Sequence, residues 1–422
     1  MAAETDYYDY RCLIQSIEHM EPGEILFILG DPHTGKTRFW NRFCQEHDNT
    51  FSLSFKGYDI SHLPSMIDLD HPTWPELLSN ISQHYEYIII DDADCGKNAD
   101  SFWETLNDSQ KQMKIVLIGN DESRIKVNKE YEAEELSLLE PCDISDALDI
   151  NGKQTKELIC ITGGYPEIMR EYKQNKAVED TIRELLEPGS AFRTLAPTIM
   201  EQLFSTVETY NTILYAISQG NNSLTEIAKH SGMKYNACLE YLKKMIAKRI
   251  VRQKESQNGH KEYYITNSYI YLWYSIVYPR QFSAETLATD DTISEFDKKL
   301  REYVYPRFFR DIAIDYLSYK RITFHRLSTD EKHQDVLIDG VNFDYVGEDH
   351  YGMLFLKCGS MNLSDLKTAT ETMPCVPFPD KIFVFMFTNK TITKACWEME
   401  KQFDNVHFIQ EKSLLRGMGL PG

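Results

Sequence analysis

The chain has 422 residues, of which 65 are acidic and 45 basic, for a formal charge of −20 at pH 7. Its 42% apolar and 26% charged residues are ordinary values for a globular protein and exclude disorder along the whole chain. The strong acidity excludes a protein that coats nucleic acid with its entire surface, although it allows a local basic patch. At roughly 100–200 residues per domain, this length predicts two to four domains.

Nine cysteines stand at scattered positions, and no two of them have the CxxC spacing of a zinc site or a dithiol redox pair. An odd number of cysteines without a pattern fits a reducing compartment. The acidic N-terminus has no apolar stretch of the kind that marks a secretory signal. Because the longest apolar runs are five or six residues, such as Ile25–Leu29, no transmembrane helix is expected. These features predict a cytoplasmic protein with no membrane partner.

Short apolar strands alternate with helical stretches in the first third of the chain. Four runs rich in β-forming residues are expected to be strands, namely Ile25–Leu29, Phe51–Phe55, Tyr85–Ile90 and Met113–Ile118. A helix is expected from about Lys36 to His47. Strands that alternate with helices predict an α/β fold, in which helices cover both faces of a parallel sheet.

The remaining chain is expected to be helical from Ser145 to Phe204 and then to change character. Three helices and two short strands are expected next, at Tyr210–Ser218, Ser223–His230, Tyr235–Arg249, Ile250–Lys254 and Glu262–Thr266. This order predicts a winged helix. From residue 290 the chain begins helical, then alternates strand and loop, and ends with a strand at Ile382–Phe387 and a helix near Ile392–Phe403.

Residues 30–37 satisfy the phosphate-binding pattern GxxxxGK[ST] with Gly30, Asp31, Pro32, His33, Thr34, Gly35, Lys36 and Thr37. The glycines allow backbone N–H groups to turn toward phosphate oxygens. Lys36 supplies a cation for the β- and γ-phosphates, and the Thr37 hydroxyl completes a magnesium shell. The following helix points its positive end at the anion. The pattern predicts a site for ATP and Mg²⁺, and the alternative is a glycine-rich turn between a strand and a helix.

Two polar strand ends follow this loop in the expected order. The apolar run Tyr87–Ile90 ends in Asp91 and Asp92, 54 residues after Thr37. Asp91 is expected to hold magnesium, directly or through water, and Asp92 to orient the attacking water. Asp92 is one methylene shorter than the Glu that many such enzymes have there, which predicts slow turnover. Asn120, at the end of the next strand, is a candidate sensor of the γ-phosphate. For both strand ends a simple turn is the alternative.

Residues 161–166 read Ile161, Thr162, Gly163, Gly164, Tyr165 and Pro166. With the preceding motifs, this stretch is similar to the GG-x-P motif of the prokaryotic family called archaeal ATPases, relatives of the AAA+ and STAND switch proteins. The resemblance covers most of the chain. It implies that Pro166 packs beside the nucleotide base at the junction with a helical lid. A helix-breaking turn between lid helices is the alternative.

The C-terminal third resembles the restriction-type nuclease domain that one branch of this family carries. That branch has the motif E-I-D followed by E-x-K, of which Asp344 and Lys357 remain here. Phe355 replaces the metal-binding Glu, and Arg310 stands where relatives have an acid. Such nucleases need two or more carboxylates to hold magnesium. We therefore expect a nuclease-like fold without nuclease activity, although substitution by another acid, Asp335 or Asp339, stays open.

Two further features concern the expected winged helix. Its usual aromatic ending appears as Tyr269–Tyr274, which we expect to lie in the core. Residues 234–261 include eight basic and two acidic side chains, which gives this segment a net charge of +6 in a chain whose net charge is −20. This asymmetry indicates duplex DNA as a partner. The residues proposed to contact DNA are Lys234, Lys243, Lys244, Lys248, Arg252 and Lys254. A solvated helix face is the alternative, and a protein partner or self-association stays open.

The motifs and the resemblance together predict a P-loop ATPase core at 1–143, a helical lid at 144–205, a winged helix at 206–285 and an inactive nuclease-like α/β domain at 286–422. The leading hypothesis is an ATP-binding, slowly hydrolysing molecular switch, in which the nucleotide state moves the lid, the winged helix and the C-terminal domain. The alternatives are a DNA-binding regulatory protein with a structural nucleotide site, and a nuclease with a remodelled site.

Overall fold

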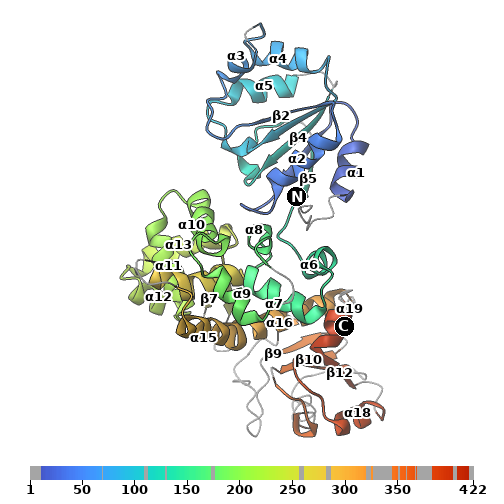
Figure 1. The fold of residues 1–422 in the computed structure, drawn as a ribbon, viewed down its shortest axis with the longest axis vertical. Helices are drawn as coiled ribbons and strands as arrows, with labels where there is room; N and C mark the ends of the chain where they lie inside the picture. The colour runs from blue at the N-terminus through green and yellow to red at the C-terminus, as the bar shows by residue number, and fades with distance from the viewer. Residues whose placement is uncertain are drawn as a thin grey trace. The chain divides into compact units, whose positions relative to one another are not determined.

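The computed structural model divides the chain into two compact units, which are described separately (Figure 1). The first comprises Met1–Leu139 together with Tyr165–Glu167, and the second comprises Glu140–Gly164 together with Ile168–Gly422. The structure describes residues 11–68, 70–108, 113–128, 131–172, 176–255, 261–281, 287–319, 325–326, 345–349, 352–357, 359–365, 367, 383–402 and 406–417.

The first unit is built on a five-stranded, fully parallel sheet with the strand order β2-β3-β4-β1-β5. Its strands are β1 (Ile25–Leu29), β2 (Thr50–Ser54), β3 (Tyr87–Asp91), β4 (Lys114–Gly119) and β5 (Glu132–Glu135). Its helices are α1 (Arg11–His19), α2 (Lys36–Glu46), α3 (Leu63–Ile67), α4 (Trp74–Ile81) and α5 (Asp100–Asp108). The predicted α/β class is therefore confirmed.

Helices cover both faces of this sheet, which explains why its central strands are apolar without alternation. Successive side chains of a strand point to opposite faces. In β1, Phe27 packs with Trp74 of α4 and Phe102 of α5 in one cluster. Its neighbour Ile28 packs with α1 and α2, including Phe39, in the other cluster. A parallel sheet buried on both faces needs apolar residues at every position.

The sequence did not predict the fifth strand of this sheet, β5. Its residues Glu132–Glu135 read Glu-Ala-Glu-Glu, which has no β-forming pattern. The strand lies at the edge of the sheet beside β1, where one side of the backbone stays unpaired and charged side chains reach water. Charged residues at an edge prevent pairing with another chain, so this composition suits the position although it hides the strand from sequence analysis.

The second unit begins with helices. They are α6 (Pro141–Leu148), α7 (Gly152–Thr162), α9 (Val178–Leu185) and α10 (Ala191–Leu203). The short helix α8 (Pro166–Met169) begins in the first unit and ends in the second. Next come α11 (Val207–Ser218), α12 (Leu224–His230) and α13 (Tyr235–Ala247), followed by β6 (Val251–Glu255) paired antiparallel with β7 (Lys261–Ile265). Ser223 caps α12, since its hydroxyl accepts a hydrogen bond from the backbone N–H of Glu226.

The aromatic stretch after β7 lies in the core, as predicted. All six residues of Tyr269–Tyr274 are buried. They span α14 (Ser268–Leu272) and the start of a π-helical turn (Trp273–Val277). The Tyr269 hydroxyl donates to the carbonyl oxygen of Phe192 and accepts from the backbone N–H of Ala196. This hydroxyl therefore fastens α14 to α10.

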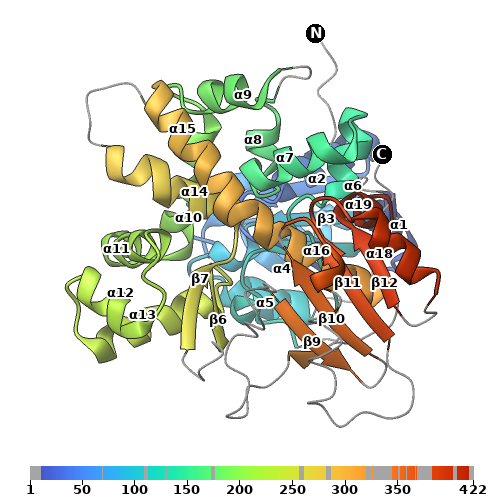
Figure 2. The ribbon, with the colours of Figure 1, turned by 90° about the horizontal axis from the view of Figure 1, so that it is seen from below.

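A second five-stranded sheet follows, with the order β12-β11-β10-β9-β8 (Figure 2). It is reached through α15 (Asp290–Lys299), a π-helical turn (Leu300–Val304) and α16 (Tyr305–Tyr319). Its strands are β8 (His325–Arg326), β9 (Tyr345–Asp349), β10 (Gly352–Lys357), β11 (Phe383–Thr388) and β12 (Val406–Gln410). Strands β10, β11 and β12 are parallel, whereas β8 and β9 are antiparallel to their neighbours.

The C-terminal part of the chain contains one strand and one helix more than the sequence predicts. The predicted last helix is α18 (Lys394–Glu400), but β12 and α19 (Glu411–Gly417) follow it. Leu414 and Leu415 of α19 pack with Phe309 of α16 and Phe387 of β11 in one buried cluster. These contacts explain why α16, far upstream in the chain, belongs to the same body as the sheet.

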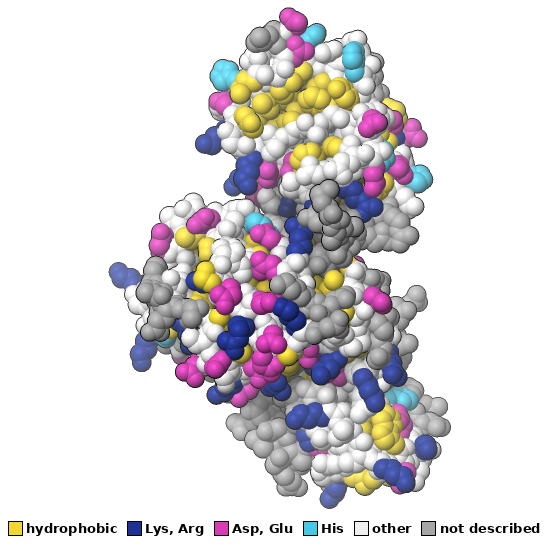
Figure 3. All heavy atoms as spheres, in the orientation of Figure 1, with side chains coloured by type: hydrophobic (Ala, Val, Ile, Leu, Met, Phe, Trp, Pro, Cys, Tyr) yellow, Lys and Arg dark blue, Asp and Glu magenta, His cyan; other side chains and the backbone are white. Residues whose placement is uncertain are grey.

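On the face that Figure 3 shows, acidic and basic side chains are interspersed over the second unit, and hydrophobic side chains gather on the first unit, at the top of the view. The exposed large hydrophobic residues of the first unit are Tyr58, Met66, Ile67 and Tyr85. Across the described parts of the chain, no helix has both the length and the apolar character that a bilayer crossing requires.

Candidate nucleotide-binding site

The loop between β1 and α2 has the backbone geometry that its glycine pattern predicts. Gly35 has φ 101° and His33 has φ 64°, so both lie in the left-handed region. A Cβ at Gly30 would lie 2.7 Å from the Leu136 carbonyl oxygen and 2.7 Å from Thr34 Oγ1. Glycine is therefore needed at 35 for its torsion and at 30 for its close neighbours. The loop ends at the N-terminus of α2, where backbone N–H groups are available to an anion.

Lys36 is buried at the centre of this loop. Its Nζ donates to the carbonyl oxygens of Gly30 at 2.6 Å and Asp31 at 2.8 Å, and to Oδ1 of Asn120 at 2.9 Å. Burial lowers the pKa of Lys36 to about 8, although the neighbouring carboxylates, Asp91 first, oppose that shift. Lys36, the predicted phosphate-binding cation, and Asn120, the predicted sensor, are therefore joined by a direct hydrogen bond.

The Asp91 carboxylate, at the end of β3, accepts three hydrogen bonds. Its Oδ2 accepts from Trp40 Nε1 at 2.7 Å and from Thr37 Oγ1 at 3.3 Å, and its Oδ1 accepts from the backbone N–H of Asp92 at 3.0 Å. The side chain is buried, and burial raises its pKa, with the charge of Asp92 as the next cause. The predicted metal-site pair, Thr37 and Asp91, is therefore assembled at hydrogen-bond distance.

These two residues suit magnesium, because Mg²⁺ prefers hydroxyl and carboxylate oxygens. Within the described residues, no group of three or more His, Cys, Asp or Glu side chains is placed to hold a metal ion by itself. In nucleotide sites Mg²⁺ takes one or two protein oxygens and completes its shell with phosphate and water. Thr37 and Asp91 would hold the ion, which would neutralise charge on the phosphates.

Asp92, the predicted water-orienting residue, has a left-handed backbone at φ 52°. Its Oδ2 accepts from Ser54 Oγ at 3.2 Å, so the end of β2 contributes to the site as well. A positive φ in an Asp is uncommon and stores a small amount of strain. The torsion turns the chain sharply after Asp91, so the two consecutive carboxylates have different hydrogen-bond partners.

A third carboxylate, that of Asp94, lies buried beneath Asn120. A Cβ at Gly119 would be only 2.7 Å from Asp94 Oδ1, which shows how closely this side chain approaches β4. Burial raises the pKa of Asp94, and a hydrogen bond from the Asn120 backbone N–H opposes that shift. Asp94 therefore accepts a hydrogen bond from the backbone of Asn120, whose side chain contacts Lys36. Sequence analysis did not single it out.

Pro166 begins the short helix α8, which belongs in part to the first unit. The next residue, Glu167, lies beside the phosphate-binding loop, since its Oε2 is 3.1 Å from Nδ1 of His33. The buried Nε2 of His33 has no hydrogen-bond partner. Tyr165–Glu167 and the loop therefore belong to the same unit, although 134 residues separate His33 from Glu167.

Most of the predicted DNA-contacting residues are exposed on the three-helix segment and its hairpin. Lys234 precedes α13, Lys243 and Lys244 lie on α13, and Arg252 lies on β6, all exposed. Lys243 pairs with Glu240 at 2.8 Å. Two further predicted contacts, Lys248 and Lys254, lie on the same segment, with Lys248 partly buried. The basic residues thus lie on neighbouring elements of one segment.

The nuclease-like residues do not form a metal site where the structure describes them. Phe355 is fully buried, and Lys357 Nζ lies 2.6 Å from Oδ1 of the buried Asp365. Arg310 pairs with Asp311. The ammonium of Lys357 is therefore engaged with an internal partner. Three predicted acids, Asp335, Asp339 and Asp344, lie outside the described residues.

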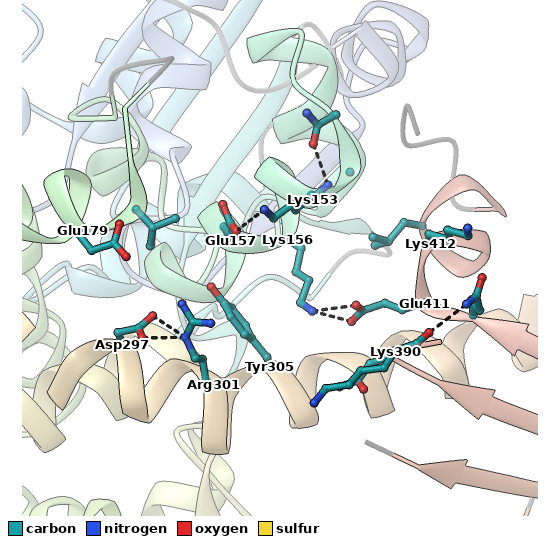
Figure 4. A pocket seen from close by; sticks show the side chains of 16 residues that line it. Lys153, Lys156, Glu157, Glu179, Asp297, Arg301, Tyr305, Lys390, Glu411 and Lys412 are labelled. Atoms are coloured by element: carbon teal, nitrogen blue, oxygen red, sulfur yellow. Dashed lines mark hydrogen bonds and ion pairs between the residues drawn. The ribbon is translucent and has the colours of Figure 1, made fainter. Parts of the chain in front are cut away.

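A cavity of about 660 Å³ lies within the second unit, lined by residues from α7, α9, the helical segment before α16, and α19 (Figure 4). Its charged side chains are largely paired with one another. Lys156 Nζ donates to both Glu411 oxygens at 2.8 and 2.9 Å and lies 4.7 Å from the Tyr305 ring centroid. Arg301 Nε donates to both oxygens of Asp297. These pairs engage charged side chains from α7, α19 and the helical segment before α16.

Two residues that sequence analysis missed, Trp40 and Asp94, contact the predicted ones directly. Trp40 lies three residues after Thr37 on α2, and residues so spaced share a helix face. That spacing is a signal that would have singled out Trp40. Asp94 lies three residues after Asp91, but in a 3₁₀ turn that no sequence pattern announces. Its role becomes visible only in the structure.

Comparison with known proteins finds no matching family model and no matching curated protein. Among solved structures, the Holliday junction branch migration motor RuvB of Thermotoga maritima is 13% identical, with 60% of this chain and 87% of that chain covered at a TM-score of 0.29. AMPPCP-bound DnaA from Aquifex aeolicus is 14% identical, with 57% and 86% covered at 0.28. We draw no functional conclusion from likenesses of this strength and rely on the site itself.

Proposed function

We propose that this protein is an ATP-binding molecular switch that hydrolyses ATP slowly with magnesium. The observation that carries this proposal is that the ends of β3 and β4 both contact the phosphate-binding loop, which itself follows β1. Lys36 of the loop reaches Asn120 after β4 at 2.9 Å, and Thr37 reaches Asp91 at the end of β3 at 3.3 Å. Ligands of open α/β sheets bind at the carboxyl ends of the strands.

Each residue then has a role set by its chemistry. Lys36 binds the β- and γ-phosphates, and the N–H groups at the start of α2 face the same anion. Thr37 and Asp91 hold Mg²⁺, while Asn120 senses the γ-phosphate through its amide. Asp92 orients the attacking water. Its short side chain also accepts from Ser54, and both features support slow hydrolysis.

The switch output is proposed to pass through the stretch around Pro166. In this proposal Pro166 packs beside the nucleotide base, and the contact of its neighbour Glu167 with His33 of the phosphate-binding loop at 3.1 Å supports that role. A loop residue that contacts this stretch gives the bound nucleotide a physical means to influence it. The helical lid, the winged helix and the nuclease-like domain, which is proposed to lack nuclease activity, are the parts that would respond.

The test is ATP binding by calorimetry and steady-state hydrolysis, in wild type and in Lys36→Ala. A hydrogen bond between charged groups is worth about 1.5–3 kcal/mol, so the substitution should weaken ATP binding roughly 10- to 150-fold. Lys126→Ala is the matched control, because Lys126 is an exposed lysine of the same unit. Lys36→Ala that binds ATP as tightly as the wild type would refute the proposal.

A second candidate function is DNA binding with a regulatory nucleotide site, favoured by the exposed basic residues of α13 and β6. The test is a gel shift with duplex DNA over a range of salt, using a triple charge reversal at Lys243, Lys244 and Arg252. If these residues contact phosphates, affinity falls and the slope of log K against log salt decreases by about 3. DNA binding that ignores the reversal would eliminate this candidate. Hydrolysis raised by DNA would instead join both functions.

A further inference from the structure

We infer that Trp40 is a positioning residue for magnesium, because its indole N–H fixes the carboxylate of Asp91. The inference rests on the proposed ATP site and adds to it a residue outside the nucleotide-binding motifs. Trp40 Nε1 donates to Asp91 Oδ2 at 2.7 Å, the shortest of the three hydrogen bonds that this carboxylate accepts. Asp91 is only 5% exposed, so protein donors take the place of water around it.

The geometry explains how three donors hold one carboxylate. Thr37 and Trp40 lie three residues apart on α2 and present their donors to the same oxygen, Oδ2. The backbone N–H of Asp92 engages the other oxygen, Oδ1, at 3.0 Å. The terminal torsion of an Asp side chain is otherwise broad. With both oxygens engaged, the carboxylate has one orientation before any metal arrives.

Thr37 holds Asp91 less closely than Trp40 does. Its hydroxyl is 3.3 Å from Oδ2, a longer contact than the 2.7 Å of the indole, and the same hydroxyl is proposed as a magnesium ligand. A hydroxyl that coordinates a cation through a lone pair keeps its O–H for Asp91, but its direction must then suit both partners. The indole N–H has no such second task, because it is a donor only. Trp40 is therefore suited to hold Asp91 in both the metal-free and the metal-bound state.

Packing of the ring is the competing explanation for Trp40. The residue is partly buried and packs against the cluster formed by α1, α2 and the sheet. Ring packing accounts for the apolar part of the side chain but does not require its N–H to face a carboxylate. Trp40→Phe separates the two explanations, since it keeps an aromatic ring on the cluster and removes the donor.

The experiment measures how strongly magnesium and ATP bind together, without using activity. ATP affinity is determined by calorimetry in EDTA and again in saturating Mg²⁺. The dissociation constant in EDTA divided by the dissociation constant in Mg²⁺ measures the coupling between the two ligands. Loss of a group that orients a metal ligand typically weakens metal binding about 10- to 100-fold. Trp40→Phe should therefore lower this ratio about tenfold or more, while ATP affinity in EDTA stays within about twofold of wild type.

Trp74→Phe is the matched control, because Trp74 Nε1 also donates a hydrogen bond in the same unit, to the Ile60 carbonyl oxygen at 2.9 Å. It should leave the ratio unchanged. Trp40→His, which keeps a ring N–H, should retain more of the coupling than Trp40→Phe, and it provides a second variant if the Phe variant fails to fold. An unchanged ratio in Trp40→Phe, or an equal loss in Trp74→Phe, overturns the inference alone. A wild type that binds no ATP in either condition refutes the proposed function too.

Discussion

Gly163 lies where a side chain cannot fit, and Gly163→Ala therefore gives a sharp test of the packing in the second unit. The residue ends α7 with φ 61° and donates its N–H to the Ile159 carbonyl oxygen at 2.8 Å. A Cβ there would lie 2.1 Å from Asn267 Oδ1 and 2.8 Å from Asn267 Cγ. That amide must move, because real Cβ atoms do not approach an oxygen so closely.

Displacing Asn267 breaks contacts with two helices. Its Oδ1 caps α14 by accepting from the N–H groups of Tyr269 and Ile270, and its Nδ2 donates to the Gly163 carbonyl oxygen at 2.8 Å. Loss of an N-cap costs about 1 kcal/mol, and loss of a hydrogen bond costs a similar amount. The left-handed torsion adds about 1 kcal/mol for a residue with a Cβ. Gly163→Ala should therefore lower the free energy of unfolding by about 3 kcal/mol.

The measurement is urea denaturation followed by circular dichroism, with Gly232→Ala as the control for backbone strain. Gly232 has φ 68°, and nothing lies within 4 Å of a Cβ built there, so its substitution should cost only about 1 kcal/mol. Asn267→Ala already lacks the cap, so Gly163→Ala added to it should cost only about 1 kcal/mol more. Equal losses in the two single glycine variants would refute the reasoning.

Three further predictions follow from the same structure. Because burial lowers the pKa of Lys36 to about 8, its charge is lost as the pH rises past that value. ATP affinity measured by calorimetry should therefore fall between pH 7 and pH 9, by up to about tenfold per pH unit above 8. Equal affinities at pH 7 and pH 9 would contradict this prediction. Lys156→Met leaves the largely buried carboxylate of Glu411 unpaired and should cost about 3 kcal/mol in urea denaturation, whereas replacing both residues with Met should recover most of the loss. Lys357 is bound to the buried Asp365, so plasmid DNA incubated with Mg²⁺ should stay uncut by the wild type, and Lys357→Ala should lower thermal stability without changing that result.

The sequence predicts the parts of the first unit that depend on local pattern. The four predicted strands become β1 to β4 with ends that shift by at most two residues. In β1, β3 and β4, burial on both faces demands nearly continuous apolar residues, whereas the edge strand β2 is only partly buried. The polar edge strand β5 has no such demand, and its sequence gives no signal. The strand order β2-β3-β4-β1-β5 also cannot be read from local pattern, since it depends on which crossovers bring distant strands together.

In the candidate site, too, residues that belong to a motif are predicted from sequence, whereas the residues that support them are not. Lys36, Thr37, Asp91 and Asn120 are predicted from motifs because their chemistry fixes both residue type and order along the chain. Their supporting contacts are not, because a supporting residue needs only a donor or acceptor in the right place, and many residue types supply one. Trp40 contacts Asp91, which lies 51 residues further along the chain, and His33 contacts Glu167, which lies 134 residues further along. No periodicity within a helix or strand encodes a contact between two elements.

Asn267 shows most clearly how such contacts connect separate motifs. Sequence analysis treats the GG-x-P turn and the aromatic helix α14 as two independent features, yet one amide serves both. It caps the helix with its oxygen and binds the Gly163 carbonyl with its nitrogen, so neither feature can shift without the other. The Asn267 amide therefore links the end of α7 to the start of α14. The double-mutant cycle of Gly163→Ala and Asn267→Ala measures this coupling, and a zero coupling energy would contradict the shared role of the amide.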